Sequence, residues 1–173
     1  LGSSGCGKST LGKSILNLLD SSYTKIESGE ILFDGVNLLE LPPHAFNQIR
    51  GKRISMIFQN PQSSLNPVFT IKDQIAEVLT AHQRLTSRQV HERIVDLLKL
   101  VRIPDPENRL NDYPHQLSGG MQQRILIAIA LANQPDLVIA DEPTTALDVT
   151  IQAQILDLMN LIRHEFRMAM ILI

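Results

Sequence analysis

Apolar positions recur at intervals of three and four residues along much of the chain, which predicts helices with one buried face. We expect helices over residues 8–19, 71–82, 87–101, 120–132 and 148–165. The first helix would bury Leu11, Ile15, Leu18 and Leu19, and the last would bury Ile151, Ile155, Leu158 and Ile162.

Shorter apolar runs predict strands over residues 53–58, 137–140 and 168–173. A strand over 30–36 with a turn at Asp34-Gly35 predicts the beginning of a hairpin. Strands that alternate with helices favour an α/β fold with a mostly parallel sheet. The helices between about 70 and 133 interrupt that alternation, so we interpret them as an inserted helical subdomain.

The composition is that of one globular domain: 173 residues, 43% hydrophobic. With 16 basic and 18 acidic residues the net charge is -2, and no basic stripe suggests a nucleic-acid partner. The longest apolar run, 125–132, is far shorter than a transmembrane helix. The chain opens at Leu1 inside a motif and ends on an apolar run, so we expect an incomplete domain cut at both ends.

A phosphate-binding loop is predicted at the start of the chain. The segment Gly2-Ser3-Ser4-Gly5-Cys6-Gly7-Lys8-Ser9 fits the pattern G-x-x-x-x-G-K-[ST] and leads directly into a predicted helix. Its glycines let successive backbone N–H groups face one anion, and the helix start adds a positive dipole end. Lys8 would reach the β- and γ-phosphates of a nucleotide, and the Ser9 hydroxyl would bind Mg²⁺.

A second candidate site follows the predicted strand over 137–140, which ends in Asp141 and Glu142. Ligands of α/β proteins bind at the carboxyl ends of parallel strands. Asp141 is placed to hold Mg²⁺, directly or through water, and Glu142 to accept a proton from an attacking water. Alone, this pattern would fit a solvated acidic turn better, because such patterns are common; together with the phosphate loop it favours catalysis.

The segment Leu117-Ser-Gly-Gly-Met121 identifies a family, because it is similar to the LSGGQ signature of the ATP-binding cassette (ABC) ATPases, with Met at the fifth position. Order and spacing of the three motifs match that family. The resemblance implies a P-loop NTPase fold, with a RecA-like core of about 1–63 and 134–173 and a helical subdomain of about 64–133. Ser118, Gly119 and Gly120 would bind the γ-phosphate of ATP held by a second subunit.

Further residues take roles from the same resemblance. Gln59 matches the glutamine that contacts the metal and the water, and Thr10 matches the contact to the α-phosphate. Thr145-Ala-Leu-Asp148 matches the loop at the subunit interface, although Asp148 also suits a helix N-cap. The aromatic residue that stacks on adenine and the switch histidine fall outside the chain. None of the five histidines has metal-ligand spacing.

Longer stretches resemble the dipeptide, oligopeptide and nickel importer branch, including Phe58-Gln-Asn-Pro-Gln-Ser-Ser-Leu-Asn-Pro67. That resemblance implies ATP hydrolysis coupled to solute import, in a head-to-tail dimer of ATPase subunits on two membrane permease subunits. The chain would lie on the cytoplasmic face of the inner or plasma membrane, and a binding protein outside would capture the solute. The alternatives are a soluble ABC ATPase that acts on nucleic acid or the ribosome, and a clamp without turnover.

Overall fold

A three-stranded parallel sheet forms the centre of the computed structural model, which describes residues 5–145 and 147–173. The strands run in the order β3 (Ile54–Ile57), β4 (Leu137–Ala140) and β5 (Ala169–Leu172). In register, Ile57 lies opposite Ala140 and Ala140 opposite Leu172. The predicted parallel α/β fold is therefore confirmed, and the carboxyl ends of all three strands meet at one edge.

Helix α1 (Lys8–Ile15) is shorter than predicted and buries a different face. Gly12 and Leu16 are buried, whereas Leu11 is 65% exposed and Leu18 is 37% exposed. The predicted core positions of this helix were therefore wrong at Leu11 and Leu18.

The early end of α1 has a local cause at Asn17, which adopts a left-handed conformation with φ of 50°. The N–H of Asn17 donates to the carbonyl of Ser14, and the N–H of Leu18 donates to that of Lys13. These two bonds form a Schellman motif, which closes a helix and satisfies its last carbonyl groups.

The expected hairpin consists of two short antiparallel strands, β1 (Leu32–Phe33) and β2 (Val36–Asn37). Its turn is tied to the sheet by Arg53, which donates hydrogen bonds to Asp34 and Asp136 and stacks on the Phe33 ring. These hydrogen bonds raise the pKa of the Arg53 guanidinium. The 3₁₀ turn η1 (Leu38–Glu40) and helix α2 (Pro43–Phe46) follow and were not predicted.

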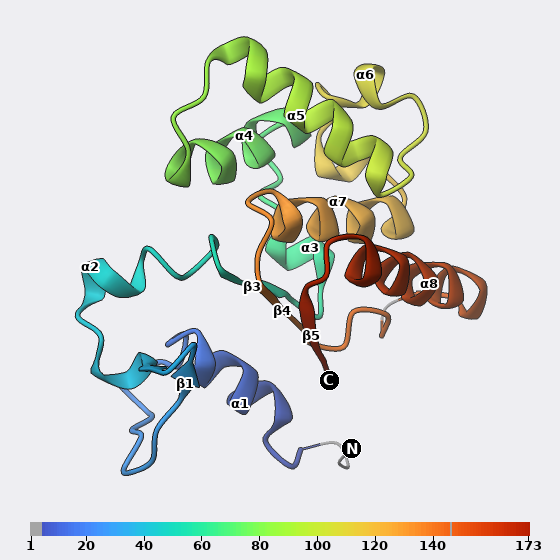
Figure 1. Ribbon diagram of the computed structural model, residues 1–173. Helices are drawn as coiled ribbons and strands as arrows, with labels where there is room; N and C mark the ends of the chain where they lie inside the picture. Colours follow the sequence, from blue (N-terminus) through green and yellow to red (C-terminus); the bar gives the residue numbers. More distant parts are fainter. Residues whose placement is uncertain (1–4, 146) are drawn as a thin grey trace.

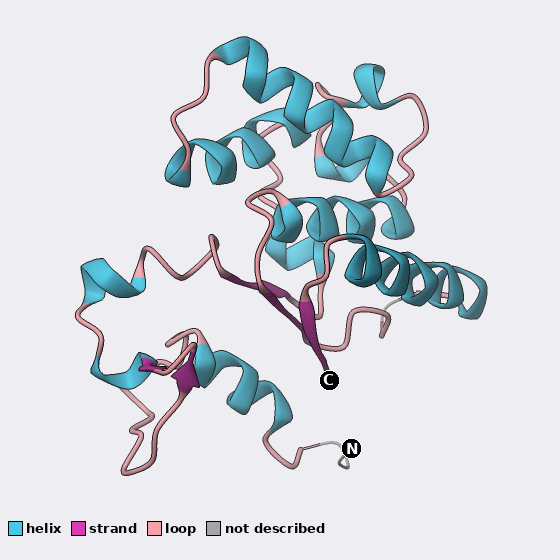
Figure 2. Ribbon diagram, viewed as in Figure 1, coloured by secondary structure: helices cyan, strands magenta, loops and turns pink. Residues whose placement is uncertain are grey.

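The helices between β3 and β4 lie to one side of the sheet, above it in Figure 1, and Figure 2 draws them, like all helices, in cyan. The long helices α4 (Ile71–His82), α5 (Ser87–Leu100) and α7 (Gly119–Leu131) agree with prediction to within one residue. The regions expected to be irregular contain single turns, namely α3 (Pro61–Ser64), α6 (Pro106–Arg109) and η2 (Pro114–Gln116). Helix α7 lies between this block and the sheet, in contact with α3, α4, α5 and β3.

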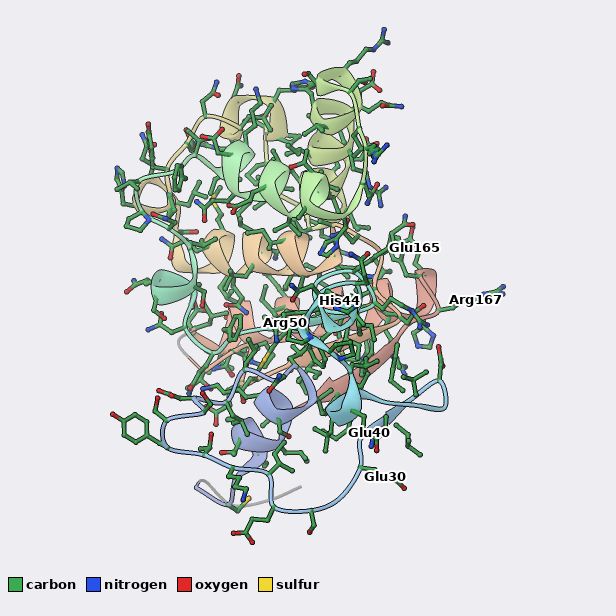
Figure 3. All side chains as sticks on the ribbon, turned by 90° about the vertical axis from the view of Figure 1, so that its left-hand side faces the viewer. Glu30, Glu40, His44, Arg50, Glu165 and Arg167 are labelled. Carbon is green, nitrogen blue, oxygen red and sulfur yellow. The ribbon has the colours of Figure 1, made fainter. Side chains whose placement is uncertain are left out.

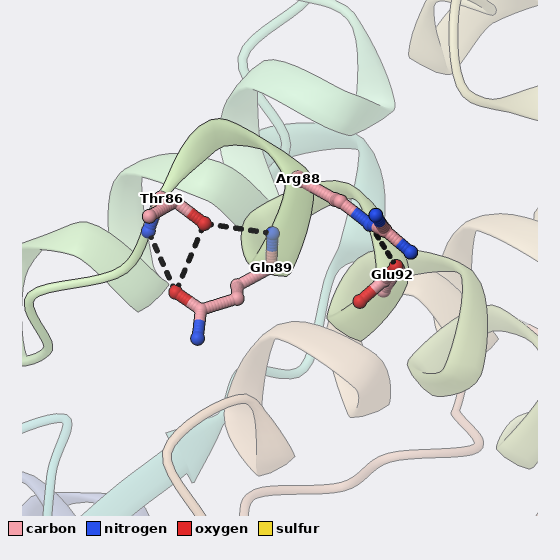
Figure 4. A network of polar contacts seen from close by, with 4 residues as sticks. All are labelled: Thr86, Arg88, Gln89 and Glu92. Carbon is pink, nitrogen blue, oxygen red and sulfur yellow. Dashed lines mark hydrogen bonds and ion pairs between the residues drawn. The ribbon is translucent and has the colours of Figure 1, made fainter.

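The start of α5 follows the predicted capping box (Figure 4). The hydroxyl of Thr86 accepts a hydrogen bond from the N–H of Gln89, and the Gln89 side chain accepts one from the N–H of Thr86. One turn further on, Arg88 and Glu92 form an exposed ion pair. The box satisfies amide donors that the first helical turn otherwise leaves without partners.

Helix α8 (Val149–Glu165) returns along the sheet and buries Ile155, Leu158 and Ile162 completely, as predicted. Ile151, expected on the same face, is half-buried at the end of that face. One continuous apolar core joins α8, the sheet and the helical block. The sheet and the helices around it are therefore held as one packed unit.

Asn133 forms a polar junction between the sheet and the helical block. Its Nδ2 donates to the carbonyls of Gly51 (3.0 Å) and Val78 (3.1 Å), and its Oδ1 accepts from Gln83 (2.7 Å). The side chain thus connects the segment before β3 with the end of α4.

Charged side chains of both signs cover the face shown in Figure 3, where Glu30 and Glu40 lie below His44 and Arg50 in that view. Arg50 also lies over the ring of Phe46, 5.0 Å from its centre. Within residues 5–145 and 147–173, no helix has the length and apolar character needed to cross a bilayer.

Candidate active site

The start of α1 is built for an anion. Gly5 and Gly7 have φ values of +80° and +92°, a left-handed conformation that glycine adopts without strain. Gly7 is the N-cap residue and provides no side chain to bond the first-turn amides. A bound anion can take the place of that missing cap, with the helix dipole in its favour.

Ser9, in the first turn of α1, meets Asp141 at the end of β4. The Ser9 hydroxyl donates a hydrogen bond to Asp141 Oδ1 over 2.7 Å. Asp141 is buried, with 4% of its surface exposed. The N–H of Asp141 also donates to the carbonyl of Ile57, which extends the pairing of β4 with β3. Two residues predicted separately as magnesium ligands are thus in direct contact across 132 positions of sequence.

Glu142 is the next residue and has an unusual backbone, with φ of 46°. Its N–H donates to the carbonyl of Ile173, just beyond β5. Its carboxylate Oε2 accepts hydrogen bonds from Gln59 Nε2 (2.6 Å) and from the Thr145 hydroxyl (2.9 Å). The two residues predicted as catalytic, Glu142 and Gln59, are therefore hydrogen-bonded to each other.

A polar cleft of about 180 Å³ opens between these elements, lined by Gly5, Gly7, Lys8, Ser9, Thr10 and Glu142. Lys8 Nζ lies 3.6 Å from the sulfur of Cys6, which is exposed in the same loop. Gly2 and Ser3, also predicted in this loop, lie outside the described residues. A larger cavity of about 480 Å³ lies beside η1, and its described lining contains none of the predicted site residues.

The signature residues lie at the start of α7, outside the described lining of this cleft. Ser118 and Gly119 are exposed, and the Ser118 hydroxyl accepts a hydrogen bond from the N–H of Met121. A Cβ atom on Gly120 would lie 3.0 Å from Ile151 of α8. Close packing of α7 against the start of α8 therefore favours glycine at position 120.

Asp148 is the N-cap of α8, as expected. Its side chain accepts a hydrogen bond from the N–H of Ile151 over 3.0 Å. The starts of α7 and α8 thus lie side by side, and they present Ser118 and Asp148 to solvent.

Arg124 anchors the signature helix on two sides. Its guanidinium donates to the carbonyl of Val101 (3.0 Å) and to the side chain of Gln154 (3.1 Å). Burial, and secondarily the positive charge of Arg102, lower the pKa of Arg124. An arginine starts from so high a pKa that it keeps its charge at neutral pH.

Two residues near the site were not predicted to act there. The hydroxyl of Thr145 contacts Glu142, and the amide of Gln152 donates to the carbonyls of Thr144 and Leu147. Gln152 follows the N-cap residue Asp148 by four positions, but this spacing belongs to no known motif, so nothing in the sequence singles out Gln152.

The donor set at the end of β4 suits a hard cation. A hydroxyl and a carboxylate are the oxygen ligands that Mg²⁺ takes when it also keeps several waters. Across the described part of the chain there is no group of three or more His, Cys, Asp or Glu side chains that could hold a metal on its own. The pair Ser9 and Asp141 therefore fits an ion that shares its coordination with phosphate and water.

The family model described as ABC transporter matches residues 1–145. This chain belongs to the ABC transporter family, as its three motifs indicated.

Similar curated proteins include ATP-binding proteins named for peptide transport. The chain is 56% identical to a probable peptide ABC transporter ATP-binding protein of Sinorhizobium fredii, over 91% of this chain and 47% of the relative. It is 50% identical to the dipeptide transport ATP-binding protein DppD of Bacillus subtilis, over 100% of this chain and 52% of the relative. The chain thus spans about half the length of these relatives.

Solved structures agree with the fold. The dimeric structure of MJ0796, a bacterial ABC transporter cassette, has a TM-score of 0.83 and 32% identity, over 99% of this chain and 71% of that chain. Another dimeric structure of that cassette, in a post-hydrolysis state bound to ADP and Pi, has a TM-score of 0.81 and 31% identity, over the same shares.

Proposed function

We propose that this chain is the ATP-binding and ATP-hydrolysing part of an ABC importer for peptides or a related small solute. The observation that carries the proposal is the cleft at the start of α1, where Ser9 meets Asp141 and Gln59 meets Glu142. Family membership and the peptide-transport names of the relatives support the same function.

The phosphate loop would hold the nucleotide. The backbone N–H groups of Gly5, Cys6 and Gly7, preceded by Gly2 and Ser3, would surround the phosphates. Lys8 would neutralise charge on the β- and γ-phosphates, and Thr10 would contact the α-phosphate.

Ser9, Asp141 and Gln59 would hold Mg²⁺. The ion supplies charge neutralisation on the phosphate oxygens when bound. Because Ser9 and Asp141 are already hydrogen-bonded, their oxygens need little rearrangement to share one ion.

Glu142 would act as the general base. A water oxygen attacks the γ-phosphorus in line with the bond to the β-phosphate oxygen, which breaks and leaves ADP. The proton of that water passes to the Glu142 carboxylate and the γ-phosphoryl group leaves as inorganic phosphate. Gln59, bound to the same carboxylate, would orient the water.

The remaining site residues would act across a head-to-tail dimer of ATPase subunits. Ser118, Gly119 and Gly120 are exposed or half-exposed at a helix start and lie outside the cleft of their own chain, which supports a role on the ATP of a second subunit. Asp148 lies beside them. The structural neighbours described as dimeric support this arrangement.

In this proposal a RecA-like core of about 1–63 and 134–173 carries the cleft, and a helical subdomain of about 64–133 carries the signature. Closure of the dimer would drive two membrane permease subunits, at the cytoplasmic face of the membrane, with solute supplied by an external binding protein. ATP favours the closed state to the extent that it binds that state more tightly. The peptide-transport relatives and the net charge of -2 favour this function over an ABC ATPase that acts on nucleic acid.

The test is Glu142→Gln in the purified full-length protein. Loss of the base should lower steady-state phosphate release by about 100-fold or more while labelled ATP still binds. Glu30→Gln is the matched control, since it removes an exposed acid far from the cleft in sequence. Phosphate release that is equal in the Glu142→Gln and Glu30→Gln proteins contradicts the role of Glu142.

A further inference from the structure

Three glutamines form the same contact in three places. Gln74, Gln122 and Gln152 each follow a helix N-cap residue by four positions. In each case the side-chain Nε2 donates to two backbone carbonyls, five and eight residues earlier in the chain, at distances between 2.8 and 3.1 Å. We call this contact a glutamine clamp, because it fixes the loop that leads into the helix.

The clamps hold the loops 66–69, 114–117 and 144–147. The second loop leads into the signature residue Ser118, and the third leads into Asp148. A carbonyl group that faces no donor is costly to bury, so each clamp satisfies two groups and restrains the loop at once.

Among the described residues, the third clamp is the one whose loop contacts the proposed base. Gln152 Nε2 donates to the carbonyls of Thr144 (3.0 Å) and Leu147 (2.9 Å), on either side of Thr145. The Thr145 hydroxyl donates to Glu142 Oε2 over 2.9 Å, and the N–H of Thr145 donates to the Glu142 carbonyl over 3.3 Å. Side chain and backbone of Thr145 both contact the residue with the left-handed conformation.

The carboxylate of Glu142 is therefore held from two sides through one oxygen. Gln59 and Thr145 both donate to Oε2. A left-handed backbone at a non-glycine residue persists when surrounding contacts over-determine it. The bond from Glu142 N–H to Ile173 and the bonds from Thr145 provide such contacts.

We infer that Thr145 is a positioning residue for ATP hydrolysis, held in place by the Gln152 clamp. Its hydroxyl orients the Glu142 carboxylate that accepts the proton. This inference rests on the proposed function and adds to it a route from the interface loop 144–147 to the base.

The first test compares Thr145→Val with Thr145→Ser in the purified full-length protein. Valine keeps the shape and removes the hydroxyl, whereas serine keeps the hydroxyl. We expect Thr145→Val to lower kcat about tenfold with KM for ATP changed by less than about twofold, because Thr145 is not in the cleft lining. Thr145→Ser should stay within about twofold of the wild-type kcat.

The second test compares Gln152→Leu with Gln74→Leu. Both variants lose two clamp bonds, but the Gln74 clamp holds loop 66–69, whereas the Gln152 clamp holds the loop of Thr145, which contacts Glu142. Thermal unfolding should show a loss of stability in both. Only Gln152→Leu should lower kcat, by about five- to tenfold, with KM for ATP unchanged.

The possible outcomes distinguish a failure of the proposed function from a failure of the positioning role of Thr145. A wild-type protein that binds ATP without turnover removes the proposed function and the positioning role with it. An active wild type together with an undiminished kcat in Thr145→Val removes the positioning role alone. A Thr145→Ser protein as slow as Thr145→Val also overturns it, because the hydroxyl is then not what matters.

Discussion

The starts of α1 and α7 are both glycine-rich helix N-termini, yet they use glycine for different physical reasons. At α1, Gly5 and Gly7 adopt left-handed backbone conformations, and no atom of the described residues lies within 4 Å of the position of a Cβ. At α7, Gly120 has an ordinary backbone but packs against Ile151, with a Cβ position 3.0 Å from that side chain. Gly5 and Gly7 thus allow the shape of the loop, and Gly120 permits close contact between two helices.

The two helix starts also differ in their caps. Gly7 has no side chain to cap α1, whereas the Ser118 hydroxyl accepts a hydrogen bond from Met121 in α7. Uncapped amides favour an anion from outside, while a capped start has already satisfied one of its donors. The comparison teaches that a helix start without a side-chain cap offers more of its amides to a bound anion than a capped start does.

The largest effect expected from this difference concerns nucleotide affinity. Lys8→Ala should weaken ATP binding by about 10- to 100-fold, or ~1.4–2.8 kcal/mol, since a charged hydrogen bond to phosphate is lost. Ser118→Ala is the matched control in the other helix start. Titration of each single subunit with labelled ATP measures both, and equal losses would show that the two starts act on the same nucleotide in one chain.

An intermediate effect is expected at Gly7. Gly7→Ala places a Cβ on a left-handed backbone, which costs about 1–2 kcal/mol of stability. Gly7→Asn should cost less, because asparagine tolerates this conformation better than alanine. Denaturant unfolding of the full-length protein measures both changes, and equal costs for alanine and asparagine would argue against a backbone origin.

The smallest effect is expected at Gly120. Gly120→Ala should be about 1 kcal/mol less stable than Gly119→Ala, because the methyl group at position 120 crowds Ile151 while both variants gain the helix propensity of alanine. Gly119→Ala is the control, since its Cβ would meet Leu147 at an ordinary 3.8 Å. The midpoint of thermal unfolding should therefore be lower for Gly120→Ala than for Gly119→Ala. The reverse order would contradict the packing explanation.

Long elements were predictable because local signals agreed with the tertiary structure. The predicted strand over 137–140 and helix over 71–82 have the bounds observed for β4 and α4. An apolar run flanked by loops marks β4, and Thr70 with Asp73 provides a capping box for α4. Ser9, Asp141, Gln59 and Glu142 were each predicted as site residues from motifs and family resemblance, whereas the contacts of Ser9 with Asp141 and of Gln59 with Glu142 were not predicted.

Other features depended on contacts that periodicity cannot reveal. Helix α1 approaches the sheet so closely that a Cβ on Gly12 would lie 3.2 Å from Ile139, so its buried face is centred on a residue without a side chain. The pattern of leucines pointed instead to Leu11, which is exposed. The clamp of Gln152 was equally hidden, because its partners are backbone carbonyls, which every sequence possesses.

The glutamine clamp has a consequence for how this chain tolerates change. Each clamp glutamine donates its Nε2 hydrogen bonds to two backbone carbonyl oxygens. These bonds therefore depend on the path of the loop backbone and little on which side chains the loop carries. Residues of a clamped loop that are also exposed can therefore be exchanged for new recognition chemistry while the helix entry keeps its geometry. For protein engineering, loop 66–69, whose four residues are exposed, is accordingly the place where sequence diversity can be introduced with the scaffold held constant.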